Sequence, residues 1–216
     1  MDIKICGLST AESVDAVIAA KATHVGFIFF EKSPRHLSAA LAAKLSARAQ
    51  AAGLKSVAVT VNADDSYLDE IVSVMKPDIL QLHGSESPER VAEVKAKYGL
   101  PVMKAFAVSS AADLDKIDPY KDIADSFLFD AKPPKGSDLP GGNGVSYDWS
   151  LLKGLDPSIQ YMLSGGLDHS NVGAAIKIAN PPGLDVSSGV ESAPGIKDLD
   201  LIAEFFAAIK TARKES

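Results

Sequence analysis

Residues 24–61 read HVGFIFFEKSPRHLSAALAAKLSARAQAAGLKSVAVTV and contain the unit from which the whole fold is built. The apolar run over 24–30 predicts a buried strand, the alanine-rich stretch over 39–52 predicts a helix, and the run over 56–61 predicts another strand. Apolar strands that alternate with helices are typical of a parallel sheet covered by helices on both faces.

The same strand-helix unit occurs eight times along the 216 residues. We expect strands over 3–6, 24–30, 56–61, 79–82, 102–106, 127–130, 161–163 and 184–186. We expect helices from Ser9 or Thr10 to about 20, over 39–52, 66–75, 88–98, near 111–117, near Trp149, and over 171–178 and 199–213. Eight units fit an α/β fold with a single domain, a (β/α)8 TIM barrel over residues 1–216. A doubly wound open sheet is the alternative, but it usually has fewer strands, and no G-x-G-x-x-G sequence follows the first strand.

The composition argues against several functional classes. A net charge of -6 without a basic run disfavours nucleic acid as a partner. No run reaches the roughly 18 apolar residues of a membrane span, and the N-terminal residues do not resemble a signal peptide. Cys6 is the only cysteine, so it has no partner for an internal disulfide, and no histidine-carboxylate spacing suggests a metal site. We therefore expect a cytoplasmic protein, and the residues leave open whether it is a monomer or a homodimer.

Reactive side chains follow several strands at the carboxyl ends, where barrel enzymes hold their active sites. They are Cys6, Arg35, His83 and Asp130. Each alone has a simpler structural interpretation. Cys6 could be a small buried residue and Arg35 part of a surface ion pair. His83 could be a hydrogen-bonded residue of a strand, and Asp130 could cap a turn. Together they place a cation and candidate acid-base groups on one rim.

Three glycine-rich segments on neighbouring loops suggest a phosphate site. Backbone N–H groups can approach an anion closely where side chains are small, and a following helix terminus adds positive charge. Any one segment alone would indicate only a turn, whereas the three on adjacent loops favour phosphate binding. The segments are Gly141-Gly142-Asn143-Gly144 in the long loop over 131–148, Ser164-Gly165-Gly166 after the seventh strand, and Ser187-Ser188-Gly189 after the eighth. We interpret the long loop as a mobile active-site loop, with an ordinary surface insertion as the alternative.

The alternation of the first strand places Lys4 and Cys6 on one face and Ile3 and Ile5 on the other. The isoleucines should meet the helices, so Lys4 and Cys6 should face the barrel interior. A buried lysine needs a counter-charge, and Asp185 on the adjacent eighth strand is the candidate. A nearby lysine lowers a thiol pKa, so we expect the pKa of Cys6 to be lowered.

The ordered segments KICG, SPR, QLHG, FD, the Gly-Gly loop before DW, GGL and DVSSGVE resemble those of the phosphoribosylanthranilate isomerases of tryptophan biosynthesis, and the resemblance covers the whole chain. It implies an aldose–ketose type isomerase that carries out an Amadori rearrangement without cofactor or metal. N-(5-phosphoribosyl)anthranilate would become 1-(2-carboxyphenylamino)-1-deoxyribulose 5-phosphate, with Asp130 as general acid and Cys6 as general base. Arg35 would hold the anthranilate carboxylate. His83 and the glycine and serine positions 142, 144, 165, 166 and 187–189 would line the substrate site.

Two other classes remain as alternatives. A different phosphate-binding barrel enzyme, such as a sugar-phosphate epimerase or the related isomerase of histidine biosynthesis, would be expected to have metal-binding histidines or an aspartate in place of Cys6. A non-catalytic barrel that binds a phosphorylated ligand would keep the glycine turns but would have no need of both Cys6 and Asp130.

Overall fold

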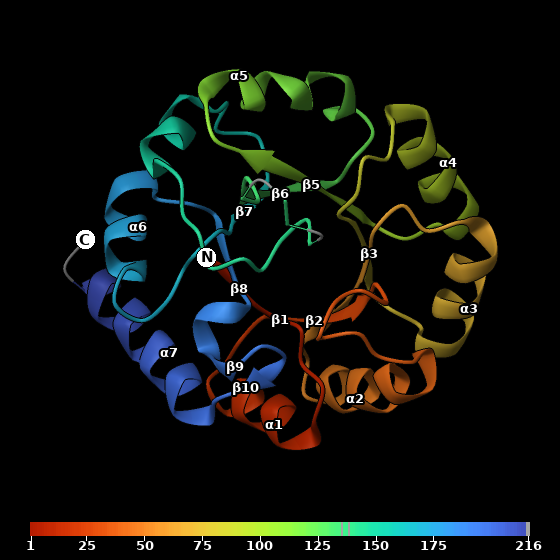
Figure 1. Ribbon diagram of the computed structural model, residues 1–216, viewed down its shortest axis with the longest axis horizontal. Helices are drawn as coiled ribbons and strands as arrows, with labels where there is room; N and C mark the ends of the chain where they lie inside the picture. The colour runs from red at the N-terminus through yellow and green to blue at the C-terminus, as the bar shows by residue number, and fades with distance from the viewer. Residues whose placement is uncertain (135, 138, 215–216) are drawn as a thin grey trace.

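The computed structural model describes residues 1–134, 136–137 and 139–214 and shows a closed barrel of parallel strands in chain order (Figure 1). The strands are β1 (Asp2–Cys6), β2 (His24–Phe29), β3 (Lys55–Thr60), β4 (Ile79–Leu82), β5 (Val102–Val108), β6 (Ser126–Ala131), β7 (Tyr161–Leu163) and β8 (Gly183–Val186). Strand β8 returns to β1 in a parallel register that places Asp185 opposite Lys4. The expected TIM barrel is confirmed, and the open sheet is excluded.

Helices form a ring around the strands (Figure 1). They are α1 (Ala11–Ala19), α2 (Ala39–Ala51), α3 (Asp65–Met75), α4 (Pro88–Tyr98), α5 (Ala111–Leu114), α6 (Val172–Ala179) and α7 (Leu199–Lys214). Short polar side chains cap four of them by accepting a backbone N–H three residues on, and these are Thr10, Ser38, Asp64 and Ser87. Among the described residues, no helix has the length and apolar character needed to cross a membrane.

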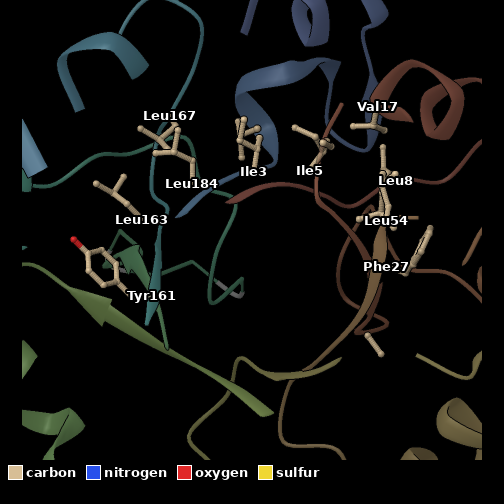
Figure 2. Packing of buried hydrophobic residues seen from close by; sticks show 14 of the residues in the cluster. Ile3, Ile5, Leu8, Val17, Phe27, Leu54, Tyr161, Leu163, Leu167 and Leu184 are labelled. Atoms are coloured by element: carbon tan, nitrogen blue, oxygen red, sulfur yellow. The ribbon is translucent and has the colours of Figure 1, made fainter. Parts of the chain in front are cut away.

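Side chains of β1 point alternately out of and into the barrel. Ile3 and Ile5 belong to the apolar layer between strands and helices, together with Phe27 and other residues (Figure 2). Cys6 instead belongs to an inner cluster with aliphatic and methionine side chains of the neighbouring strands. The predicted orientation of β1 is confirmed, because residues two apart on a strand share a face.

The ring of helices departs from the prediction at two units. The helix expected near 111–117 is α5 followed by a 3₁₀ helix, η1 (Asp115–Tyr120), which contains Pro119. A proline lacks the N–H that a continued α-helix would need, which explains the change of type. The helix expected near Trp149 is also 3₁₀, η2 (Trp149–Gly154).

A small hairpin follows β8 and was not predicted. After a short 3₁₀ helix, η3 (Ser188–Val190), the chain forms β9 (Glu191–Ala193) and β10 (Ile196–Lys197), which pair antiparallel. The turn between them is Pro194-Gly195, and Gly195 has a left-handed φ of 83°. A Pro-Gly pair is a recognised turn signal, so the sequence contained evidence for this hairpin.

The segment between β6 and η2 lies over the mouth of the barrel. Leu139, Pro140, Gly142 and Val145 contribute to the wall of the pocket there. The Asn143 amide donates to the Leu139 carbonyl at 3.1 Å and thereby closes a turn. Lys135 and Asp138 of the predicted loop lie outside the described residues. The position agrees with an active-site loop, and its mobility stays a prediction.

Candidate active site

A pocket at the carboxyl ends of the strands collects most of the predicted site residues. Its wall includes Cys6, Arg35, His83, Asp130, Gly142, Gly165, Gly166, Ser187 and Ser188. Gly144 and Gly189 are not part of this wall, and their expected contact with the substrate stays a prediction. Gly189 packs against the Leu167 carbonyl, where any Cβ would collide with it. The close approach of two loops therefore explains this glycine without a ligand.

Cys6 ends β1 with its thiol against Gly26 of β2. A Cβ built on Gly26 would lie 2.8 Å from Cys6 Sγ and 3.1 Å from Lys4 Cε, so the glycine makes room for both side chains. Lys4 Nζ lies 2.9 Å from Asp185 Oδ1, as predicted. The Ser164 hydroxyl donates to the other oxygen of Asp185 at 3.3 Å. The base candidate therefore sits beside a buried, hydrogen-bonded ion pair.

The expected lowering of the Cys6 pKa is wrong. Burial is the largest influence and raises the pKa of the thiol; Lys4 and Lys197 lower it, Asp185 raises it, and the net direction is upward. Lys4 itself has a raised pKa, because Asp185 and Cys6 outweigh the effect of burial. Burial destabilises the thiolate by more than the neighbouring ammonium groups stabilise it, since Asp185 already neutralises one of these groups.

Asp130 is the last residue but one of β6, and it faces His83, which directly follows β4. His83 Nε2 lies 3.6 Å from Asp130 Oδ2, and the Ala131 N–H donates to the other oxygen at 2.8 Å. The Gln81 amide nitrogen lies 2.8 Å from His83 Nδ1. This contact holds the imidazole ring in one orientation, with Nε2 directed toward Asp130. His83 thus lies beside the acid candidate, where it can orient it.

Gly141 of the long loop completes this side of the pocket. A Cβ at position 141 would collide with Asp130 Oδ2 and would lie 2.9 Å from His83 Nε2. The glycine therefore lets the loop backbone cover the carboxylate. This use of a predicted glycine is steric, in contrast to the phosphate role expected of its segment.

Arg35 forms a bidentate ion pair that sequence reasoning missed. Its Nε and Nη2 donate to the two carboxylate oxygens of Glu191 at 2.7 and 2.8 Å. Lys197 Nζ donates to Glu191 Oε1 at 2.6 Å from the hairpin. Glu191 is the last residue of the quoted segment DVSSGVE, and it received no role because a single glutamate beside glycines gives no specific signal.

One glycine turn of the pocket wall has the backbone geometry expected of an anion site. Gly165 and Gly166 have left-handed φ values of 92° and 62°. Their N–H groups donate no hydrogen bond to any residue in the described part of the chain. Ser188, also in the pocket wall, begins η3 two residues after the end of β8. Free N–H groups beside a short helical turn favour a phosphate group there.

No group of three or more His, Cys, Asp or Glu side chains that could hold a metal ion occurs in residues 1–134, 136–137 and 139–214.

Comparison with known proteins identifies the family. A family model described as N-(5'phosphoribosyl)anthranilate (PRA) isomerase matches residues 3–208. A protein of Mesorhizobium japonicum named N-(5'-phosphoribosyl)anthranilate isomerase is 62% identical over 215 residues, which cover 100% of this chain and 98% of the relative. One of the same name from Agrobacterium fabrum is 62% identical over 208 residues, covering 96% and 94%.

Solved structures agree with this match. Phosphoribosyl anthranilate isomerase from Thermotoga maritima superposes with a TM-score of 0.86 at 32% identity and covers 99% of both chains. Another structure, at 31% identity and a TM-score of 0.84, covers 98% of this chain and 99% of its own. It shows a phosphoribosyl anthranilate isomerase in complex with reduced 1-(o-carboxyphenylamino)-1-deoxyribulose 5-phosphate. From the match along nearly its whole length, this chain belongs to the N-(5'-phosphoribosyl)anthranilate isomerase family.

Proposed function

We propose that this chain isomerises N-(5'-phosphoribosyl)anthranilate to 1-(2-carboxyphenylamino)-1-deoxyribulose 5-phosphate, a step of tryptophan biosynthesis, with Asp130 as acid and Cys6 as base. The observation that carries the proposal is that Cys6 of β1 and Asp130 of β6 line one pocket. The reaction only moves protons and electron pairs within one molecule, so a proton donor and a proton acceptor meet its chemical needs.

Asp130 starts the reaction by giving a proton to the ribose ring oxygen. The bond from that oxygen to C1 breaks, the oxygen becomes a hydroxyl group, and the nitrogen lone pair forms a C=N bond to C1. His83 and the Ala131 N–H lie at the two carboxylate oxygens, so the acid is oriented from both sides. Holding the donor in one geometry lowers the entropic part of the barrier.

Cys6 completes the rearrangement by removing the proton from C2. The electrons of that C–H bond form a C1=C2 bond, and the C=N pair returns to the nitrogen as a neutral enolamine. Tautomerisation then transfers a proton to C1 and leaves a ketone at C2. The thiolate that acts as base is favoured by Lys4 and Lys197, which both lower the pKa against the effect of burial.

The substrate has a negative group at each end, and the pocket offers a separate donor set for each. Arg35 Nη1 is not used by Glu191 and lies toward Gly142, where a Cβ would be 2.7 Å from it. We assign the anthranilate carboxylate to this guanidinium and the phosphate to the Gly165-Gly166 turn and Ser188. Two anchors fix the sugar between acid and base. A free thiol base also favours a reducing compartment, so we place the reaction in the cytoplasm.

The test is the decay of anthranilate fluorescence with the ribosylamine formed in situ. Wild-type chain should accelerate the decay, and Cys6→Ser or Asp130→Asn should each lower kcat by roughly 10²–10⁴-fold. Asp156→Asn is the matched control, because Asp156 is an exposed carboxylate that caps a turn before β7 through Ser158. It should leave kcat unchanged.

Binding of the reduced product analogue by calorimetry separates catalysis from recognition. Both active-site variants should still bind it, because the carboxylate and phosphate anchors are intact. If the wild-type chain binds the analogue but the fluorescence decays no faster than it does spontaneously, the proposed isomerase activity is rejected. That result would support a non-catalytic barrel that binds a phosphorylated ligand.

A further inference from the structure

Lys197 is a buried cation that the acid-base chemistry does not itself require. Its side chain is only 1% exposed, although it lies on the two-residue strand β10 at the edge of the barrel mouth. Nζ donates to Glu191 Oε1 at 2.6 Å and to the Ser187 carbonyl at 2.8 Å. Burial of a lysine is costly unless its partners compensate, and here burial lowers the pKa of Lys197 despite Glu191.

The charges around Arg35 explain why a second cation is useful. Arg35 and Glu191 alone form a neutral bidentate pair, which attracts an anionic substrate weakly. Lys197 shares the same carboxylate, so the group of Arg35, Glu191 and Lys197 carries a net charge of about +1. Gly195 keeps the hairpin close, because its N–H donates to Glu191 Oε2 at 3.2 Å and its backbone packs against the Pro34 carbonyl.

Lys197 also connects this cluster to the base. The Ser187 hydroxyl donates to the Cys6 carbonyl at 3.1 Å, while Lys197 holds the Ser187 carbonyl. The charged groups around the thiol are Lys4 from β1, Asp185 from β8, Arg35 from the loop after β2, and Lys197 from the hairpin. Asp185 neutralises Lys4 through their ion pair, whereas Lys197 belongs to a cluster with an excess of positive charge.

We propose that Lys197 is a positioning residue for the isomerisation, which keeps Arg35 effectively cationic toward the substrate carboxylate and stabilises the Cys6 thiolate. This rests on the proposed function and extends it to the β9–β10 hairpin. Lys197 acts through Glu191 and through its field, without contact to the reacting atoms.

The test compares Lys197→Met with Lys197→Arg. Lys197→Met should raise KM roughly tenfold, because the pair left behind is neutral. It should also lower kcat and move the pH midpoint of Cys6 alkylation by iodoacetamide upward. Lys197→Arg should retain the wild-type midpoint and most of the activity. A folded Lys197→Met chain with unchanged KM and unchanged midpoint would overturn the proposal.

A double variant keeps the test decisive if Lys197→Met fails to fold. Lys197→Met with Glu191→Gln leaves no unpaired buried carboxylate and returns the cluster to about +1. We expect a KM near that of wild type together with a raised alkylation midpoint. An alkylation midpoint equal to that of wild type in the folded double variant would show that Lys197 does not stabilise the Cys6 thiolate. A KM as high as that of Lys197→Met would show that the net charge of the cluster does not determine KM.

Lys104 provides the matched control. It is also buried, and its Nζ lies 3.1 Å from Glu86, but it is not one of the charged groups that shift the pKa of Cys6. Lys104→Met should lower the melting temperature without moving the alkylation midpoint, and a shift as large as that of Lys197→Met would indicate a merely structural effect. The alkylation rate can be measured without turnover, so it tests the role of Lys197 independently of the isomerase activity. A wild-type chain without activity would reject the proposed function but not the effect of Lys197 on the thiol.

Discussion

Lys4 and Asp185 form an ion pair inside the barrel, with Nζ 2.9 Å from Oδ1 and the lysine side chain fully buried. The pair joins the first and last strands at the register where the barrel closes. We expect Lys4→Met to lower the free energy of unfolding by about 3–5 kcal/mol, because it leaves a buried carboxylate without a counter-charge. Urea unfolding measures this. Lys4→Met with Asp185→Asn should recover much of the loss, and a single variant within about 1 kcal/mol of wild type would contradict the interpretation.

Alkylation of Cys6 should have a pH midpoint above that of an ordinary cysteine. Burial raises the pKa of the thiol more than Lys4 and Lys197 lower it. The rate of iodoacetamide labelling against pH, followed by mass spectrometry, gives the midpoint directly, since the chain has no other cysteine. Lys4→Met should move the midpoint further upward. A midpoint below that of a free cysteine would show that the nearby lysines outweigh burial.

Much of this site could be predicted from the sequence because strand alternation is a local property. The period of two in β1 was enough to place Lys4 and Cys6 on the inner face. The need of a buried lysine for a counter-charge then indicated Asp185 on the neighbouring strand of a closed barrel. The direction of the thiol pKa could not be obtained this way, because desolvation depends on neighbours far apart in the chain. Val57, Met103 and Leu128 share the inner cluster with Cys6 and help to exclude water from it.

The bidentate ion pair between Arg35 and Glu191 is a second feature that could not be predicted from the sequence. Arg35 and Glu191 are 156 residues apart, and their contact depends on a hairpin whose two strands hold only five residues. Neither the periodicity nor the spacing of charges indicates that a particular glutamate will meet a particular arginine. The Pro194-Gly195 signal predicts a turn but not the partner that the turn brings into place.

Gly26→Ala should impair both stability and activity. The added Cβ would lie 2.8 Å from Cys6 Sγ and 3.1 Å from Lys4 Cε, in a region with no free space. We expect a loss of about 1–3 kcal/mol in unfolding free energy from overpacking, with a lower kcat because the thiol is displaced. Gly173→Ala in α6 is the control, since its Cβ would lie an ordinary 3.7 Å from Ala212 Cβ. Equal effects of the two substitutions would argue against crowding of the thiol.

His83→Gln should reveal whether this residue orients the acid or binds substrate. Its Nε2 faces Asp130 Oδ2 at 3.6 Å, and Gln81 fixes its other nitrogen. An orienting role predicts a fall in kcat of roughly tenfold or more with little change in KM. A rise in KM alone would instead support the substrate-binding role expected from the sequence. Steady-state kinetics on the two parameters distinguishes these outcomes.

His24 should make the barrel sensitive to mild acid. This side chain is 5% exposed beside Lys4 at the amino end of the strands, and the Thr23 hydroxyl lies 2.7 Å from its Nδ1. Burial lowers the pKa of His24 from 6.5 to about 4; Asp2 and Asp185 oppose this, and Lys4 and Lys55 reinforce it. The unfolded chain therefore binds a proton at pH values where the folded chain does not.

The sign of the pH effect follows from that difference. Well above pH 6.5 the imidazole is neutral in both the folded and the unfolded state, so it does not change the free energy of unfolding. As the pH falls toward 4, the unfolded state binds the proton first, and the folded state is destabilised relative to it. At about 1.4 kcal/mol per unit, unfolding free energy should drop by about 2 kcal/mol between pH 6.5 and 5. Urea unfolding across this range measures the slope, and His24→Gln should flatten it. The buried carboxylate of Glu191, whose pKa is lowered, becomes important only at more acidic pH. A slope that is unchanged in His24→Gln would assign the acid sensitivity to another group.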